Sequence, residues 1–422
     1  MDSLLIKGGN KLYGEIDISG SKNASLPIMI ASLLTEDKVK LKNIPTLADV
    51  KTLIEILKSL GAEIKTSSDV IELRTKEIIS NRASYDLVKK MRASFWVLAP
   101  LIARTGYAEV SLPGGCAIGT RPVDIYLKIL KKMGVNISIN DGYIIAKTEK
   151  ALKGINFKLK KESVGCTHFF LMLSATANGV SHLSNAACEP EVQALGEMLN
   201  KMGAKIYGLG TNELTIKGVS KLDGISLKVP PDRIETGTFA IALGIVGGKI
   251  TLRNTIHSEN KLLLNLLSKS GILIKTKNNS IILEKNDTEI KPVNIDTRPY
   301  PGFPTDLQAQ FMSLMTLSNG KSFIRENIFE NRFMHVQELV RLGADIKLKG
   351  DKAIINGVKK IKGANVMATD LRASASLVIA ALAATDITKI SRIYHLDRGF
   401  YNLEEKLNNC GASIKRVKER NG

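Results

Sequence analysis

A sixfold internal repeat constrains this chain more than any other feature. The pattern Leu-x3-Gly-x2-Ile recurs at intervals of 68 to 73 residues, with its glycines at Gly61, Gly134, Gly203, Gly271, Gly343 and Gly411. The leucines are Leu57, Leu130, Leu199, Leu267, Leu339 and Leu407, and the isoleucines are Ile64, Ile137, Ile206, Ile274, Ile346 and Ile414. A fixed period of this length indicates six copies of one structural unit.

Each position of the pattern has a physical meaning. Leucine completes the apolar stripe of an amphipathic helix, glycine caps the helix in a left-handed conformation, and isoleucine begins a strand. A second helix, rich in Ala, Leu, Ile and Met, should begin in each unit near Ser21, Met91, Val164, Ile234, Pro304 and Asp370. Such helices, for example 24–34, 92–103 and 372–384, should be buried. We therefore expect an α/β (α+β) protein of two halves, each with three buried helices inside and sheets outside.

Composition bounds the class of protein. The 422 residues are 44% hydrophobic and 24% charged, which is typical of a globular protein. The absence of an apolar run of eighteen residues and of a signal-peptide pattern predicts a cytoplasmic protein with no membrane partner. Scattered cysteines without a Cys-x-x-Cys pair, and five unpaired histidines, argue against a disulfide framework and against a metal centre.

The net charge of +19 has two interpretations. One is binding to nucleic acid or to a membrane surface, and the other is a lysine-rich surface that attracts small anions. Aromatic residues make up only 5% of the chain, and none are interleaved with a basic run. We therefore favour small anionic ligands and expect no nucleic-acid partner.

The segment 112–124 places Cys116 in a glycine-rich loop, five residues before Arg121. Glycines allow the backbone to approach a ligand closely, and a nearby cation lowers the pKa of a thiol. The segment is therefore either a flap that carries a reactive cysteine over an anionic substrate, or a tight turn with a buried, inert cysteine.

Polar residues cluster where the buried helices should begin. Helix N-termini bind anions, and a basic residue there opposes the helix dipole, so Lys22, Arg92 and Arg372 favour an anionic ligand. Asp232 and Asp370 are either N-caps or site residues, whereas the turn before Asp306 favours a placed carboxylate over a cap. Arg398 is either a surface arginine or a second clamp for phosphate or carboxylate.

These residues resemble the enolpyruvyl transferases over essentially the whole chain. The resemblance rests on the segments 20–24, 91–94, 113–116, 231–237, 303–306, 330–335 and 370–375. It implies two inside-out α/β barrel domains of three repeated units each. The first would span 22–231 and carry the Cys116 loop, and the second would combine 1–21 with 232–422. The family's active site lies in the cleft between its domains.

The resemblance is closest to the members that use a UDP-sugar. It implies transfer of the enolpyruvyl group of phosphoenolpyruvate to the 3′-hydroxyl of UDP-N-acetylglucosamine by addition and elimination, with release of phosphate. This is the first committed step of peptidoglycan precursor synthesis, and it needs no resident cofactor. Shikimate 3-phosphate is the rival acceptor, and an RNA-binding protein related to RNA 3′-phosphate cyclases is a different class of alternative. No oligomeric state follows from the sequence.

The resemblance also assigns roles to residues. Cys116 would be the acid, would form a covalent adduct and would react with fosfomycin, and Asp306 would be the base. Lys22, Asn23, Arg121 and Arg398 would hold phosphoenolpyruvate. Tyr126 departs from the family, in which histidine is common, and Glu162 adds a negative charge near the expected diphosphate. The UDP-sugar would bind at Arg92, Arg121, Pro122, Val123, Asp124, Ile125, Lys161, Ser163, Val164 and Ile328, with Asp370 and Arg372 lining the same cleft.

Overall fold

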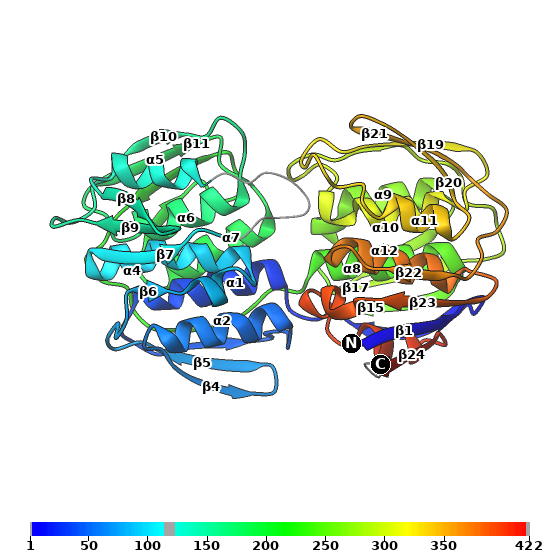
Figure 1. Ribbon diagram of the computed structural model, residues 1–422, viewed down its shortest axis with the longest axis horizontal. Helices are drawn as coiled ribbons and strands as arrows, with labels where there is room; N and C mark the ends of the chain where they lie inside the picture. The colour runs from blue at the N-terminus through cyan, green and yellow to red at the C-terminus, as the bar shows by residue number, and fades with distance from the viewer. Residues whose placement is uncertain (1, 114–122, 419–422) are drawn as a thin grey trace. The chain divides into compact units, whose positions relative to one another are not determined.

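The computed structural model describes residues 2–113 and 123–418, which form two compact units (Figure 1). We call residues 20–113 and 123–230 the middle unit, and residues 2–19 and 231–418 the terminal unit. The chain passes between them at Ser19–Gly20 and at Pro230–Pro231, within two residues of the boundaries suggested by the sequence. Each unit has its own hydrophobic core.

The strands of the described residues form six four-stranded sheets with one shared topology. In each sheet an edge strand runs parallel to its neighbour, and the other two pairings are antiparallel. In the middle unit, the first sheet has the strand order β14 (Ile225–Lys228), β3 (Val39–Lys42), β5 (Val70–Arg74), β4 (Glu63–Ser67). The second has the order β6 (Arg82–Ala83), β7 (Tyr107–Ser111), β9 (Tyr143–Lys147), β8 (Asn136–Asn140). The third has the order β10 (Asn156–Lys158), β11 (Val180–Ser184), β13 (Glu213–Lys217), β12 (Lys205–Tyr207).

The terminal unit repeats this arrangement and explains why the two ends of the chain fold together. Its first sheet has the strand order β2 (Leu12–Asp17), β15 (Gly248–Arg253), β17 (Ser280–Lys285), β16 (Leu273–Lys277). The second has the order β18 (Ile295–Asp296), β19 (Lys321–Arg325), β21 (Lys352–Asn356), β20 (Asp345–Lys349). The third has the order β22 (Asn365–Met367), β23 (Ile387–Ser391), β1 (Asp2–Lys7), β24 (Ser413–Lys418). Strand β1 lies between β23 and β24, so blue and red segments are adjacent in Figure 1.

The outer, amphipathic helices are α2 (Ala48–Ser59), α5 (Asp124–Lys132), α7 (Pro190–Lys201), α9 (Lys261–Lys269), α11 (Val336–Arg341) and α13 (Leu403–Asn408). The repeat glycine follows each one with φ between 95° and 111°. The residue after the glycine donates its N–H to the carbonyl of the repeat leucine at 2.9–3.1 Å in all six copies. This is the Schellman cap, so the predicted glycine caps are confirmed.

The inner helices are α1 (Lys22–Ala31), α4 (Leu98–Thr105), α6 (Val164–Ser174), α8 (Arg233–Val246), α10 (Gln308–Met315) and α12 (Leu371–Leu382). They are largely buried, and α8, α10 and α12 contact one another in the core of the terminal unit. The prediction of helices inside and sheets outside is confirmed, but the strands described form six open sheets and no closed barrel. No helix among these residues is long and apolar enough to cross a membrane.

Short 3₁₀ helices and one single-turn α-helix complete the fold. The α-helix is α3 (Tyr85–Val88). The 3₁₀ helices are η1 (Ser32–Leu34), η2 (Arg92–Val97), η3 (His257–Asn260), η4 (Thr305–Leu307) and η5 (Ile393–Arg398). Because η2 leads into α4 and η4 into α10, the second and fifth inner helices begin with a tighter turn than the sequence pattern predicts.

A buried ion pair anchors the segment of the terminal unit that ends at Ser19. Glu235, in the first turn of α8, accepts hydrogen bonds from the Ser19 backbone N–H and from the Lys406 ammonium on α13. Lys406 also donates to the Ser19 hydroxyl at 2.7 Å. Burial raises the pKa of Glu235, and the charge of Lys406 opposes that shift. The ammonium therefore keeps a buried carboxylate ionised next to the chain crossing.

Lys406→Met should lower the free energy of unfolding by about 3–5 kcal/mol at pH 8, because it leaves the Glu235 carboxylate buried without its cation. The pKa of Glu235 is higher in the folded protein than in the unfolded chain, so the folded protein binds a proton at this carboxylate more readily. The loss of unfolding free energy caused by Lys406→Met should therefore shrink as pH falls towards 5. Urea unfolding at both pH values measures this. The matched double variant Glu235→Gln/Lys406→Met should recover most of the loss, and an equal loss at both pH values would contradict this account.

Candidate active site

Asp306 of the terminal unit is held between two arginines. It lies in η4, and its Oδ1 accepts a hydrogen bond from Arg332 Nη2 at 2.9 Å while its Oδ2 accepts one from Arg372 Nη2 at 2.6 Å. Gln310 Nε2 donates to the Asp306 backbone carbonyl at 2.9 Å. The Asp306 side chain keeps 25% of its surface exposed. The interpretation of Asp306 as a placed carboxylate therefore has direct geometric support.

Both arginines are almost completely buried. Each is only 5% exposed. The guanidinium carbon of Arg332 lies 5.5 Å from the centroid of the Phe329 ring, and that of Arg372 lies 5.8 Å from the centroid of the Phe400 ring. A buried cation is costly unless it is paired, and Asp306 supplies the negative charge. We predicted an anionic ligand as the reason for Arg372 at a helix N-terminus, but a carboxylate of the protein already pairs with it.

Arg332 is the site residue that sequence reasoning missed. The segment 330–335 was recognised as part of the resemblance, yet Arg332 received no role. It lies 26 residues beyond Asp306, so only the fold reveals that the two side chains meet. An arginine between Phe329 and Phe333 was the available signal, because aromatic neighbours often accompany a buried guanidinium group.

Asp370 and Asp232 are N-caps. Asp370 accepts hydrogen bonds from the backbone N–H groups of Arg372 and Ala373 at 2.8 and 3.1 Å. Asp232 accepts from Ile234 and Glu235 at 2.7 and 3.0 Å. The N-cap alternative is thus confirmed for both residues, and Asp370 positions Arg372 by fixing the first turn of α12.

The charge of Asp370 acts on two histidines, His335 and His395. Burial lowers the pKa of His335 to about 4, with the Asp370 charge opposing the shift and Arg332 adding to it. Burial also lowers the pKa of His395, and the charge of Arg398, at the end of η5, contributes. Both imidazoles are therefore neutral at neutral pH, and the positive charge of this region comes from its arginines.

In the middle unit, Lys22 and Asn23 begin α1. The Ser21 side chain caps the helix by accepting from the Ala24 N–H at 3.3 Å. Lys22 Nζ lies 3.8 Å from Asp49 Oδ2 on α2, and the two side chains are only 13% and 6% exposed. Asn23 is half-buried beside Lys22. The Lys22 ammonium is thus held in a largely buried position at a helix N-terminus.

Arg92 lies in a second group of the middle unit, together with Tyr126, Ser163 and Cys166. Burial raises the pKa of both Tyr126 and Cys166, and Arg92 opposes both shifts. Ser163 caps α6 by accepting from the Cys166 N–H at 3.3 Å. A Cβ atom on Gly165 would lie 2.4 Å from the Tyr126 hydroxyl oxygen, so tyrosine here requires glycine at 165. The departure at Tyr126 is therefore accommodated within the protein core.

Val164 is the first residue of α6, while Lys161 is exposed just before it. Asp124 and Ile125 begin α5, and Val123 precedes them.

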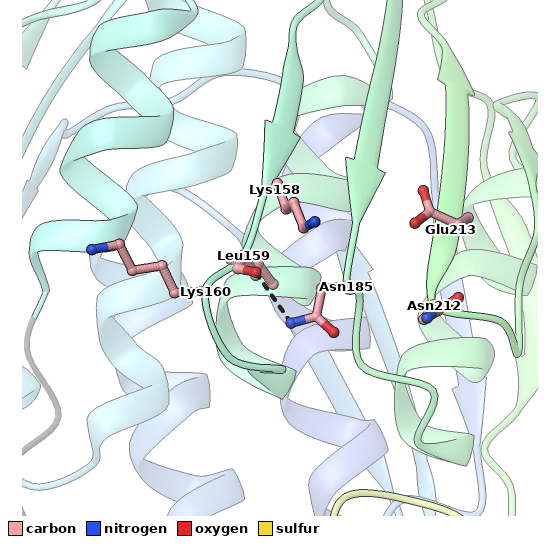
Figure 2. Close-up of a pocket in the computed structure, with 6 residues that line it drawn as sticks. All are labelled: Lys158, Leu159, Lys160, Asn185, Asn212 and Glu213. Carbon is pink, nitrogen blue, oxygen red and sulfur yellow. Dashed lines mark hydrogen bonds between the residues drawn. The ribbon is translucent and has the colours of Figure 1, made fainter.

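The residues that precede Lys161 in the chain help to form a polar pocket of about 480 Å³. The pocket is lined by Lys158, Leu159, Lys160, Asn185, Asn212 and Glu213 (Figure 2). Asn185 Nδ2 donates to the Leu159 carbonyl at 3.1 Å and fixes its wall. None of the predicted site residues lines this pocket.

Cys116, Arg121 and Pro122 lie outside the described residues, so their roles stay predictions. Ile328 is half-buried in the terminal unit and donates its N–H to Glu326 at 2.9 Å. The structure thus joins Asp306 directly to Arg372. Among the residues described, no group of three or more His, Cys, Asp or Glu could hold a metal ion.

Comparison with known proteins decides the family. Residues 6–407 match the family described as EPSP synthase (3-phosphoshikimate 1-carboxyvinyltransferase). Proteins named UDP-N-acetylglucosamine 1-carboxyvinyltransferase from Bartonella henselae and Mesorhizobium japonicum are 55% and 53% identical, over 99% of this chain and 100% of theirs. The chain belongs to the enolpyruvyl (1-carboxyvinyl) transferase family.

Solved structures share the fold of this enolpyruvyl transferase. The enolpyruvyl transferase NikO of Streptomyces tendae superposes with a TM-score of 0.89 at 23% identity, covering 99% of both chains. EPSP synthase of Acinetobacter baumannii superposes with a TM-score of 0.79 at 18% identity, covering 99% of this chain and 100% of that one. This chain therefore shares its overall fold with both of these structures.

A double-mutant cycle on Asp306 and Arg372 of this transferase should give a coupling energy of about 1.5–3 kcal/mol, because the bond joins a carboxylate to a buried guanidinium group. Asp306→Ala, Arg372→Ala and the double variant are compared by urea unfolding. The exposed pair Asp17 and Arg253, joined at 3.0 and 2.7 Å, is the matched control and should give less than about 1 kcal/mol. A coupling at Asp306 no larger than the control's would show that burial adds nothing to the pair.

Proposed function

We propose that this chain transfers the enolpyruvyl group of phosphoenolpyruvate to the 3′-hydroxyl of UDP-N-acetylglucosamine and releases phosphate. The observation that carries the proposal is identity of 52–55% over 99% of the chain to several proteins named for this activity. The chain would then be a transferase of alkyl groups other than methyl, acting in the cytoplasm at the first committed step of peptidoglycan synthesis, with both substrates small molecules.

Asp306 is the proposed proton acceptor for the attacking hydroxyl. Each of its oxygens accepts from one guanidinium group, and a carboxylate has about four acceptor positions in all. Hydrogen bonds from two buried arginines fix the orientation of the carboxylate, which favours a reaction that needs the base at one position.

Addition and elimination also require a proton donor and cations. We propose Cys116 as the donor to the methylene carbon of phosphoenolpyruvate, as the resemblance implies. The ammonium of Lys22 and the guanidinium groups of Arg121 and Arg398 would bind the phosphate and carboxylate of phosphoenolpyruvate. Lys22 suits this role because it lies largely buried at the N-terminus of α1, where an anion is also favoured by the helix dipole.

The UDP-sugar would bind the middle unit through the residues at the start of α5 and α6, together with Arg92 and Lys161, while Asn23 would act beside Lys22 at the phosphoenolpyruvate. Val123, Asp124 and Ile125 lead into α5, and Ser163 and Val164 begin α6. From the terminal unit, Ile328, Asp370 and Arg372 would line the same site. The proposed reaction uses no resident cofactor, because phosphoenolpyruvate is a co-substrate.

Phosphate release tests the acceptor directly. The full chain should release phosphate from phosphoenolpyruvate with UDP-N-acetylglucosamine and not with shikimate 3-phosphate, the acceptor for which the matched family is named. The matched control omits the acceptor. Release with shikimate 3-phosphate alone would overturn the acceptor. Silence with both, together with strongly salt-dependent RNA binding, would favour the nucleic-acid alternative.

A further inference from the structure

Glu326 is a buried carboxylate to which sequence reasoning gave no role. It directly follows β19 and is only 5% exposed. Four neutral groups donate hydrogen bonds to it. Its Oε1 accepts from the Thr297 hydroxyl at 2.9 Å and from the backbone N–H groups of Ile328 and Phe329 at 2.9 and 3.2 Å. Its Oε2 accepts from the Thr305 hydroxyl at 2.9 Å.

The fold holds Glu326 firmly in this position. Strands β18 and β19 pair in parallel, and the Thr297 N–H continues the ladder by donating to the Arg325 carbonyl at 2.9 Å. Asn327 then donates its backbone N–H to the Thr297 hydroxyl at 2.8 Å. The Glu326 N–H donates to the Asp351 carbonyl at 2.9 Å. The backbone on both sides of Glu326 is thus fixed, so its carboxylate can serve as a rigid acceptor.

Two of the four donors, Thr305 and Phe329, connect Glu326 to the Asp306–Arg332 pair. Thr305 is the residue before Asp306 and the first residue of η4. Phe329 supplies the ring that lies against the Arg332 guanidinium group. Glu326 therefore ties the turn that carries the carboxylate to the loop that supports its guanidinium partner, although 20 residues separate Asp306 from Glu326 in the chain.

We propose that Glu326 is a positioning residue for Asp306: through Thr305 and Phe329 it holds the proton acceptor and its arginine in register. The proposal rests on the proposed function, in which Asp306 accepts the proton of the sugar hydroxyl. Displacement of a reacting group by about 1 Å can reduce the rate about a hundredfold. Loss of the Glu326 contacts should therefore act mainly on kcat.

Thr305→Val is the most selective test, because it removes the hydroxyl that reaches Glu326 and keeps the shape of the side chain. We expect kcat for phosphate release to fall about ten- to a hundredfold, with KM for either substrate changing less than about threefold. Thr388→Val is the matched control. Thr388 is buried in β23 of the same unit, and its hydroxyl has no partner among the described residues. An unchanged kcat in Thr305→Val would overturn the proposal.

Two conservative variants of Glu326 distinguish the effect of side-chain length from the effect of charge. Glu326→Gln keeps the reach of the side chain: its amide oxygen can still accept hydrogen bonds at the Oε1 position, and its NH₂ group can donate to the Thr305 hydroxyl. It should retain kcat within about fivefold. Glu326→Asp is one methylene too short to bridge the same groups and should lose kcat at least as strongly as Thr305→Val. Equal rates in the two Glu326 variants would contradict the positioning role.

Amide hydrogen exchange gives a readout that does not depend on the reaction. Glu326→Asp should speed exchange at the Ile328 and Phe329 amides at least tenfold, and leave the β15–β17 sheet of the same unit unchanged. Unchanged exchange at these amides would overturn the proposal even in an active enzyme. A wild-type chain inactive with both acceptors would instead refute the proposed function, and exchange would still decide whether Glu326 holds the turn.

Discussion

Six copies of one backbone hydrogen bond organise this molecule. Each runs from the residue after a left-handed glycine to the leucine carbonyl four residues before that glycine. It ends an outer helix and directs the chain into the next strand, so every unit closes in the same way. A side chain at these glycines would be strained by the positive φ, which explains why the glycine recurs with its leucine and isoleucine. The sheets and inner helices that carry the site residues follow from this repeated turn.

Buried charges determine what the terminal unit can do. Arg332 and Arg372 are both buried and both bind the carboxylate of Asp306. Glu326 is buried as well, but within the described part of the chain its four hydrogen-bond partners are all neutral donors. The Lys406–Glu235 pair is a third case, in which an ion pair secures the backbone at a chain crossing. Pairing with an opposite charge explains how the arginines beside Asp306 and the Lys406–Glu235 pair can be buried. Hydrogen bonding explains how Glu326 can be buried.

Local features of the fold could be predicted from the sequence. The glycine caps and the N-caps Asp232 and Asp370 depend on residues within one turn of each other, where sequence pattern and backbone conformation are directly linked. The open form of the sheets could not be predicted in this way, because strand pairing joins distant segments such as β1 and β24. The 3₁₀ starts at η2 and η4 were also missed.

The candidate site shows the same division. Asp306 was recognised from its turn, whereas its bonds to Arg332 and Arg372 join residues 26 and 66 positions apart. For Arg372 the sequence suggested an anionic ligand, and the structure adds the Asp306 carboxylate as a partner within the protein. Glu326 had no signal in the sequence, since a glutamate after a strand is normally exposed. The roles of Cys116, Arg121 and Pro122 still rest on the resemblance.

The central claim is that Asp306, held by two buried arginines, accepts the proton of the sugar hydroxyl. Single-turnover phosphate release by Asp306→Asn, with phosphoenolpyruvate and UDP-N-acetylglucosamine both saturating, tests it most directly when UDP-sugar binding is measured by calorimetry alongside. The account predicts a rate at least about a hundredfold below that of the wild type, with the Kd for the UDP-sugar changed only a few-fold. A rate within about threefold of the wild type would contradict it.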